Sequence, residues 1–147
     1  MIPEYDKNGN LPPGRHQAAW DEIVQRYGYN QRRRNLLDRL KGVLDQLKAA
    51  GCRRAYLDGS FITRKTHPRD YDLCWDLRGV DRYVLDPLFI LTVNLMPPRL
   101  AQKEKYGGDI LPTCPNPPVF DHLSYFQEDD RTGVLKGIIE LDLDDLR

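Results

Sequence analysis

The longest regular pattern of apolar and polar positions lies between residues 30 and 51. Apolar side chains recur there at the spacing of one helix face: Leu36, Leu37, Leu40, Val43, Leu44 and Leu47. Asn30 has the chemistry of an N-cap, and Gly51 has that of the residue that ends a helix. We therefore expect a long amphipathic helix that packs on the core.

Shorter patterns predict the remaining elements. Helical spacing or composition indicates three further helices, over about residues 15–27, part of 81–95, and 100–106. Apolar runs and alternation indicate strands over residues 54–57, 70–77, 109–111 and 135–143. Turn-forming residues are frequent in residues 1–14, which we expect to form an extended N-terminal arm.

Composition limits the classes of function. With 147 residues and no repeat or linker, the chain is expected to form a single domain over residues 1–147. Its 22 basic and 22 acidic residues balance, which argues against strong, indiscriminate nucleic-acid binding. The three cysteines are widely spaced, so we expect neither a disulfide framework nor a zinc site. We see no signal peptide and no apolar stretch of about 20 residues, and we expect a cytoplasmic protein without membrane contact.

A glycine–serine turn followed by two spaced aspartates carries the candidate chemistry. Gly59 and Ser60 come directly after a predicted strand, and Asp70 and Asp72 begin the next one. Because side chains alternate along a strand, the two aspartates are expected to share a face, while Tyr71 points into the core. Two carboxylates so close together repel each other unless a cation lies between them.

Residue chemistry suggests which cation and which ligand would be bound here. Mg²⁺ prefers oxygen ligands from a few carboxylates and from substrate phosphates. Gly59 lets the backbone approach a phosphate closely, and Ser60 offers its N–H and hydroxyl to phosphate oxygens. The segment therefore indicates a metal site beside a nucleotide phosphate site.

The same segment resembles the signature of the polymerase-beta-like nucleotidyltransferase superfamily, since nine residues separate Ser60 from the Asp70-Tyr71-Asp72 triplet. Further segments are similar to a small, largely uncharacterised bacterial and phage family that is predicted to have the minimal nucleotidyltransferase fold: residues 11–16, 20–22, 58–65, 68–72 and 133–139. The resemblance implies an α/β (α+β) fold, with a mixed twisted sheet and flanking helices. The sequence departs from the superfamily pattern at Asp58, where an apolar residue is preferred.

The resemblance also implies roles for single residues. Superfamily enzymes transfer a nucleoside monophosphate from a nucleoside triphosphate to a hydroxyl. Asp70 and Asp72 would bridge two Mg²⁺ (or Mn²⁺) ions. Asp109, in a segment similar to the family's third-carboxylate strand, would ligate the catalytic ion and help to deprotonate the acceptor. Arg64 and Lys65 are candidates for neutralising the triphosphate, and ordinary solvated loop charge is the alternative.

The sequence is compatible with more than one acceptor and with two other classes of function. We expect a macromolecular acceptor, either a protein side chain or an RNA 3′ end. A partner protein is expected by analogy with stand-alone domains of toxin–antitoxin or defence pairs. One alternative is a non-catalytic NTP-binding or antitoxin-like interaction module. Another is an RNA-binding accessory protein that uses the basic run Arg32–Arg34 and residues 64–65.

A second acidic series near the C-terminus is interpreted differently. Glu140, Asp142 and Asp144 alternate with apolar residues, and no glycine–serine turn precedes them at a suitable spacing. We expect the solvent-facing side of a strand. Asp76 lies on the predicted face of Asp70 and Asp72, but it is about 13 Å beyond Asp72 along an extended strand, too far to share a metal.

Overall fold

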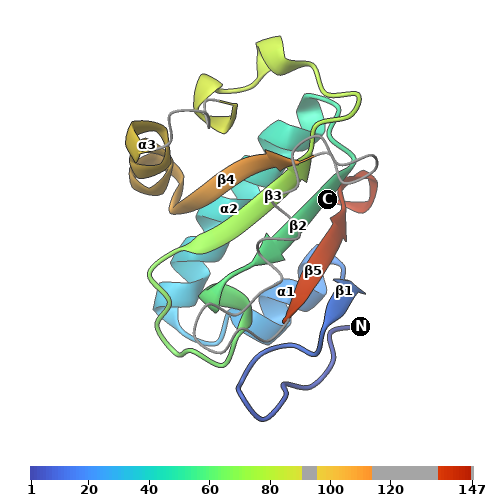
Figure 1. The fold of residues 1–147 in the computed structure, drawn as a ribbon, viewed down its shortest axis with the longest axis vertical. Coiled ribbons are helices and arrows are strands. Elements are labelled where there is room, and N and C mark those ends of the chain that lie inside the picture. Colours follow the sequence, from blue (N-terminus) through green and yellow to red (C-terminus); the bar gives the residue numbers. More distant parts are fainter. Residues whose placement is uncertain (91–95, 114–135, 147) are drawn as a thin grey trace.

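The computed structural model describes residues 1–90, 96–113 and 136–146. The described residues form a five-stranded mixed sheet in the order β1–β5–β2–β3–β4 (Figure 1). Its strands are Gly14–Gln17 (β1), Arg54–Asp58 (β2), Tyr71–Asp76 (β3), Gly108–Thr113 (β4) and Gly137–Asp142 (β5). The β1–β5 and β3–β4 pairs are parallel, and β2 is antiparallel to both of its neighbours. The mixed sheet and the α+β class agree with the expectation from sequence.

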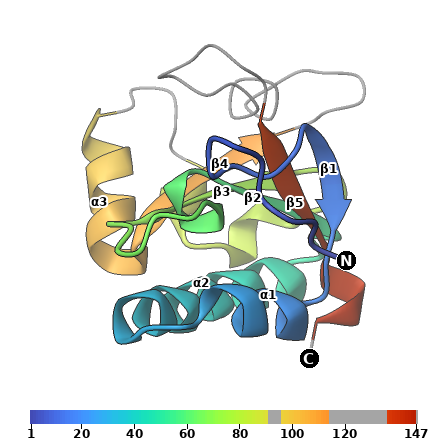
Figure 2. The same ribbon diagram turned by 90° about the horizontal axis from the view of Figure 1, so that it is seen from below.

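Two helices cover one face of the sheet. Helices α1 (Trp20–Tyr27) and α2 (Gln31–Ala49) lie side by side below the sheet in Figure 2. Helix α3 (Met96–Tyr106) lies at the edge of the sheet and packs against β4. The predicted caps of α2 are confirmed, because the Asn30 side chain accepts a hydrogen bond from the backbone N–H of Arg33, and Gly51 follows with φ +95°. None of the described helices is long and apolar enough to cross a membrane.

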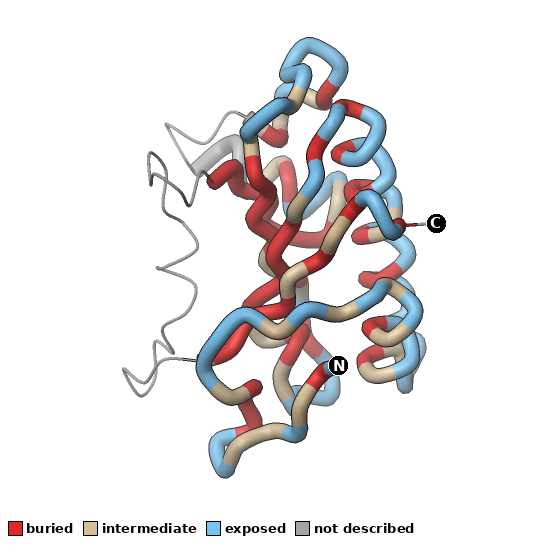
Figure 3. Tube along the Cα trace, turned by 90° about the vertical axis from the view of Figure 1, so that its right-hand side faces the viewer, coloured by how far each residue is buried: buried red, intermediate tan, exposed pale blue. Residues whose placement is uncertain are grey.

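The main core lies between these helices and the sheet. The whole predicted apolar stripe of α2 is buried, and it packs with residues of three strands, including Leu57, Leu73 and Ile139. Burying one such side chain stabilises the fold by about 1.5–3 kcal/mol, so this layer is the main source of stability. Buried positions follow the central strands and the inner sides of the helices (Figure 3). A smaller apolar cluster lies on the opposite face: Tyr56, Cys74, Leu111 and Ile138.

Residues 14–17 correct one sequence-based prediction. They form β1, whereas the spacing of apolar residues predicts that a helix begins near residue 15. The reason is a long-range pairing, in which Gly14 lies opposite Gly137 and Gln17 opposite Glu140. The preceding arm is also tied to the molecule, since Ile2 and Leu11 are buried in the core.

The structure also corrects the prediction of a helix within residues 81–95. The described part of this segment contains two single 3-10 turns, Arg82–Val84 and Pro87–Phe89. Asp81 and Asp86 cap these turns by accepting hydrogen bonds from backbone N–H groups. Pro87 has no N–H to donate to a continuous helix, which explains the break. Residues 91–95 lie outside the described part.

The other expected elements are found within a few residues of their predicted ends. The strand predicted over 135–143 is β5, and the helix predicted over 100–106 is part of α3. Cys52 and Cys74 are buried. Cys114 lies outside the described residues.

Candidate active site

Three carboxylates from adjacent strands lie in one row across the sheet. Asp58 ends β2, Asp72 lies in β3 and Asp109 lies in β4. The strand register places Asp58 opposite Asp72, and Asp72 opposite Asp109. Facing residues of neighbouring strands project to the same side of a sheet, so these three residues, the aspartate row, share one face.

The row lies on the face opposite α1 and α2. The residues next to it along the strands, Leu57, Tyr71 and Leu73, are buried in the core on the helix side. The alternation predicted for this strand is therefore confirmed. Asp70 directly precedes β3 and lies two residues before Asp72, which brings it toward the same face.

Negative charge is concentrated at Asp72. Burial, together with the charges of Asp109, Asp70 and Asp58, raises the pKa of Asp72 to about 8. A hydrogen bond between the Asp72 and Asp109 side chains also contributes to this rise in pKa. Asp58 and Asp109 are each only 2 % exposed, so water screens the row poorly. Burial and the neighbouring carboxylates therefore favour the protonated form of Asp72 when no cation is bound.

Gly59 packs directly against this carboxylate. A Cβ atom on residue 59 would lie 1.9 Å from Asp72 Oδ2, and the backbone of Gly59 has φ +80°. Only glycine adopts this conformation readily, and only glycine leaves room for the carboxylate. Ser60 begins a single 3-10 turn, Ser60–Ile62, whose end is held by a hydrogen bond from Thr63 Oγ1 to the Ser60 carbonyl (2.7 Å).

Arg33 holds the loop that follows this turn. Its side chain is fully buried, and its guanidinium donates hydrogen bonds to the backbone carbonyls of Phe61 (2.6 Å), Thr63 (3.1 Å) and Lys65. The guanidinium carbon also lies 4.9 Å from the centre of the Phe61 ring. Arg33 therefore fixes the turn that carries Gly59 and Ser60 to the first turn of α2.

This finding corrects the interpretation of the basic run Arg32–Arg34 as an RNA contact, but only at its middle residue, because Arg32 and Arg34 are exposed. Arg33 is neither a solvated charge nor an accessible RNA contact, because it is buried against backbone carbonyls. Arg32 Nε donates to the Pro68 carbonyl at 3.0 Å, and Arg34 donates to the Gly28 carbonyl at 3.1 Å. The sequence does contain one signal for this burial. Arg33 lies three and four residues before Leu36 and Leu37, so it falls on the apolar face of α2.

The two basic residues predicted to lie near the phosphates are placed on the surface. Arg64 and Lys65 are both exposed. The guanidinium of Arg64 lies 5.6 Å from the centre of the Tyr5 ring, and its backbone N–H donates to the Gly9 carbonyl. No ion pair between these residues and the aspartates is found within the described part of the chain.

Two other lysines, which the sequence analysis missed, pair with the carboxylates. Lys103 Nζ lies 3.5 Å from Asp70 Oδ2 and 3.9 Å from Asp109 Oδ1. Lys136 Nζ lies 3.8 Å from Asp58 Oδ1 at the other end of the aspartate row. Lys103 lies outside the segments that resemble the small family. Lys136 lies within one of them, residues 133–139, but no pattern there assigns it a role, and only the folded arrangement brings both lysines to the row.

Asp76 lies outside the site, as expected. Its carboxylate pairs with the guanidinium of Arg78, which donates to it from Nε at 2.9 Å. Although burial acts in the opposite direction, the hydrogen bonds from Arg78 hold the pKa of Asp76 below its usual range. Asp76 is therefore a locally neutralised carboxylate.

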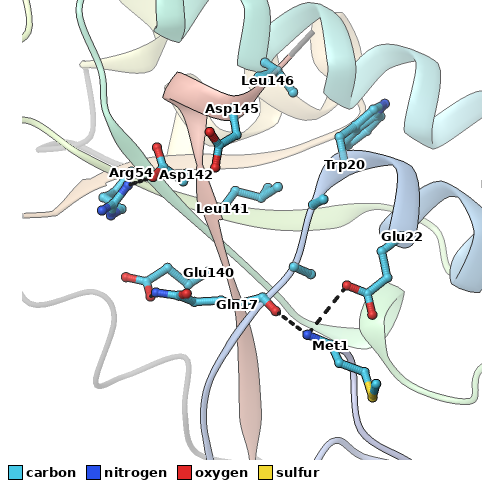
Figure 4. Close-up of a pocket in the computed structure, with 12 residues that line it drawn as sticks. Met1, Gln17, Trp20, Glu22, Arg54, Glu140, Leu141, Asp142, Asp145 and Leu146 are labelled. Carbon is cyan, nitrogen blue, oxygen red and sulfur yellow. Dashed lines mark hydrogen bonds and ion pairs between the residues drawn. The ribbon is translucent and has the colours of Figure 1, made fainter.

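The acidic side chains of the second series also interact with neighbouring side chains. Asp142 lies 2.7 Å from Arg54, Asp144 lies 3.5 Å from Arg53, and Glu140 accepts a hydrogen bond from Gln17. A cavity of about 230 Å³ lies beside these residues (Figure 4). Its lining contains no member of the aspartate row, and it combines acidic side chains with the apolar ring of Trp20.

The donor chemistry of the site suits a hard divalent cation. Within residues 1–90, 96–113 and 136–146, no group of three or more His, Cys, Asp or Glu side chains converges so as to hold a metal ion. Asp72 and Asp109 interact with each other instead. Yet the available ligands are carboxylate oxygens in a buried, strongly anionic site, which are the ligands that Mg²⁺ and Mn²⁺ prefer. Asp70, Asp72 and Asp109 are the residues predicted to hold such an ion, and their side chains would have to rearrange to converge on it.

Comparison with models of protein families gives a match over most of the chain. The model of a protein family described as a family of unknown function (DUF6932) matches residues 3–142. This range runs from the N-terminal arm to the end of β5 and includes the whole aspartate row. No curated protein and no solved structure matches the chain.

Proposed function

The chain belongs to DUF6932, a family of unknown function, and we propose that it is a metal-dependent nucleotidyltransferase. The observation that carries this proposal is the register that aligns Asp58, Asp72 and Asp109 across three strands, with Asp70 beside them. Burying so many carboxylates together is costly unless positive charge compensates them. A site of this kind suits divalent cations that carry a nucleoside triphosphate.

The proposed reaction transfers a nucleoside monophosphate to a hydroxyl. The acceptor oxygen bonds to the α-phosphorus, the bond from that phosphorus to the β-phosphate oxygen breaks, and pyrophosphate leaves. Asp70, Asp72 and Asp109 would hold two Mg²⁺ or Mn²⁺ ions, which when bound stabilise the attacking and leaving oxygens. Asp109 helps to take the proton of the acceptor hydroxyl.

The turn after β2 is proposed to position the phosphates. Ser60 offers its N–H and hydroxyl to phosphate oxygens, and Gly59 lets the chain pass close to the aspartate row. Arg33 keeps this turn in place through its hydrogen bonds to the following carbonyls. Arg64 and Lys65 stay candidates for the triphosphate, because both are exposed in the same loop.

The acceptor is proposed to be a macromolecule, either a protein side chain or an RNA 3′ end. By analogy with other stand-alone domains, a partner protein in a toxin–antitoxin or phage-defence pair is the context we propose. The burial of Arg33 does not favour the alternative of an RNA-binding accessory protein, since the middle of the basic run is unavailable to RNA.

The test is label transfer from each α-labelled NTP with Mg²⁺ or Mn²⁺, in the presence of cell RNA or lysate proteins. Wild-type protein is compared with Asp70→Asn, Asp72→Asn and, as a matched control, Asp144→Asn, which removes an exposed carboxylate outside the row. We expect transfer by the wild type and the control only. Equal transfer by all four proteins, or none by a folded wild type under any condition, contradicts the proposal.

A second candidate is a non-catalytic NTP-binding module. The pairing of Lys103 and Lys136 with the aspartates favours it, because these ammonium groups neutralise part of the site without any metal. This candidate predicts that nucleotide binds and is recovered unchanged. Equilibrium binding measured beside the transfer assay distinguishes the two functions.

A further inference from the structure

Lys103 lies at the entrance to the aspartate row. Its ammonium is within 4 Å of two carboxylates, at 3.5 Å from Asp70 and 3.9 Å from Asp109. The Lys103 side chain is 44 % exposed, whereas that of Asp109 is 3 % exposed. The ammonium therefore contacts the buried charge from the solvent side.

The backbone beneath Lys103 is fixed, whereas its side chain can move. The neighbouring Gln102 is fully buried and bridges α3 to β4. Its amide donates to the Ile110 carbonyl at 2.8 Å and accepts from the Ile110 N–H at 2.9 Å. Lys103 extends from this fixed point on a flexible four-carbon stem, so its ammonium can change partners without any movement of α3.

We propose that Lys103 exchanges one anionic partner for another during substrate binding. In the metal-free protein it pairs with Asp70 and Asp109. When a divalent cation takes these carboxylates, the ammonium leaves them and binds the phosphates of the nucleotide. This inference rests on the proposed function, because it requires a metal and a nucleotide at the aspartate row.

Charge and geometry support this exchange. An ammonium and a divalent cation compete for the same carboxylate oxygens, because they repel each other at short distance. The divalent cation wins, since hard oxygen ligands bind it more strongly than they bind one ammonium. A displaced Lys103 remains beside the site, where the phosphates of the nucleotide are the nearest compensating charge.

Lys105 provides a matched control on the same helix. It lies in the same last turn of α3, but its Nζ pairs with Asp86 at 2.7 Å and lies over the Tyr106 ring. Lys105→Met removes the same net charge as Lys103→Met without touching the aspartate row. Any difference between the two variants therefore reports the position of the charge and not its loss.

The experiment measures two affinities for each protein. Binding of Mn²⁺ alone is followed by electron paramagnetic resonance. Binding of non-hydrolysable α,β-imido nucleoside triphosphates in saturating Mn²⁺ is followed by calorimetry. For Lys103→Met we expect Mn²⁺ alone to bind about two- to fivefold more tightly, because a partly exposed ion pair no longer competes. We expect the analogue to bind about tenfold more weakly, because a charged hydrogen bond to phosphate is lost.

The controls separate this inference from the proposed function. Lys105→Met should match the wild type in both affinities, and Lys103→Arg should remain within about twofold of it, since the charge is kept. If the wild type binds Mn²⁺ and the analogue, but Lys103→Met binds both as Lys105→Met does, the exchange is overturned while the proposed function stands. Weaker Mn²⁺ binding by Lys103→Met overturns it as well. A folded wild type that binds no Mn²⁺ overturns both.

Discussion

Gly59 and Asp72 are so close that residue 59 has no room for a side chain, because its Cβ would lie 1.9 Å from Asp72 Oδ2. The glycine begins the turn after β2, and the aspartate lies in the middle of the aspartate row. The shape of the turn and the placement of the carboxylate therefore depend on each other.

Gly59→Ala is expected to damage the site more than the fold. The alanine must push away the Asp72 carboxylate and adopt a positive φ, which costs about 1–3 kcal/mol. Gly79→Ala is the matched control, since Gly79 also has a positive φ (+74°) but a Cβ added there would meet no atom within 4 Å. Thermal unfolding and Mn²⁺ binding should show that only Gly59→Ala loses the metal. Equal Mn²⁺ affinity in both variants would contradict this expectation.

Arg33→Met should destabilise the loop between Ser60 and Asp70, because it removes the hydrogen bonds that hold this loop to α2. The substitution keeps an apolar stem but leaves the buried carbonyls of Phe61, Thr63 and Lys65 without their donor. We expect a loss of about 2–4 kcal/mol in the free energy of unfolding, measured by chemical denaturation. Arg34→Met, on the exposed side of the same helix turn, should cost less than about 0.5 kcal/mol. Hydrogen exchange at residues 61–65 should rise only in the first variant.

The pKa of Asp72 predicts how the stability of the metal-free protein depends on pH. The pKa is about 8 in the folded protein and about 4 in the unfolded chain, so folding favours the protonated carboxyl. Its stabilising contribution is complete below about pH 4 and is lost as the pH rises toward 8.

Asp72→Asn should remove that part of the pH dependence, because an amide cannot ionise. In chelator at pH 8 this variant should therefore unfold at a higher temperature than the wild type. Mg²⁺ should stabilise the wild type and leave the variant unchanged. Identical pH profiles for the two proteins would rule out a raised pKa at this position.

Gln102→Leu should separate α3 from β4 locally. The leucine leaves the buried N–H and carbonyl of Ile110 without partners, at an expected cost of about 1–3 kcal/mol. Because Lys103 follows directly, its ammonium should lose its fixed distance from the aspartates. Thermal unfolding measures the first effect. Addition of Lys103→Met tests the second, since its effect on Mn²⁺ affinity should be smaller in the Gln102→Leu background.

Local sequence patterns were sufficient to predict much of the secondary structure around the site. The apolar stripe and caps of α2 depend on residues three and four positions apart, which the sequence displays directly. The inward orientation of Tyr71 and Leu73, on the face opposite Asp72, follows from strand alternation alone. These features need no knowledge of the partner strands, and the structure has them where the sequence predicts them.

Long-range contacts account for what the sequence analysis missed. Arg33 looks like one of three surface charges until the carbonyls of a loop some 30 residues away surround it. Lys103 meets Asp70 only because α3 packs against β4, the strand next to β3, in the folded molecule. Residues 14–17 form a strand because β5 lies next to them, more than 120 residues further along the chain. None of these partners is marked by local spacing.

The position of β5 in the sheet has a consequence for synthesis of the protein. It lies between β1 and β2, although it follows the other four strands along the chain. Until the segment that carries β5 has left the ribosome, β1 has no partner strand. Lys136 cannot reach Asp58 before then either. A nascent chain that lacks β5 exposes the open edge of β2. Completion of the site is thus tied to translation of this strand, so that products truncated before it should lack the Lys136–Asp58 pair and be prone to aggregate.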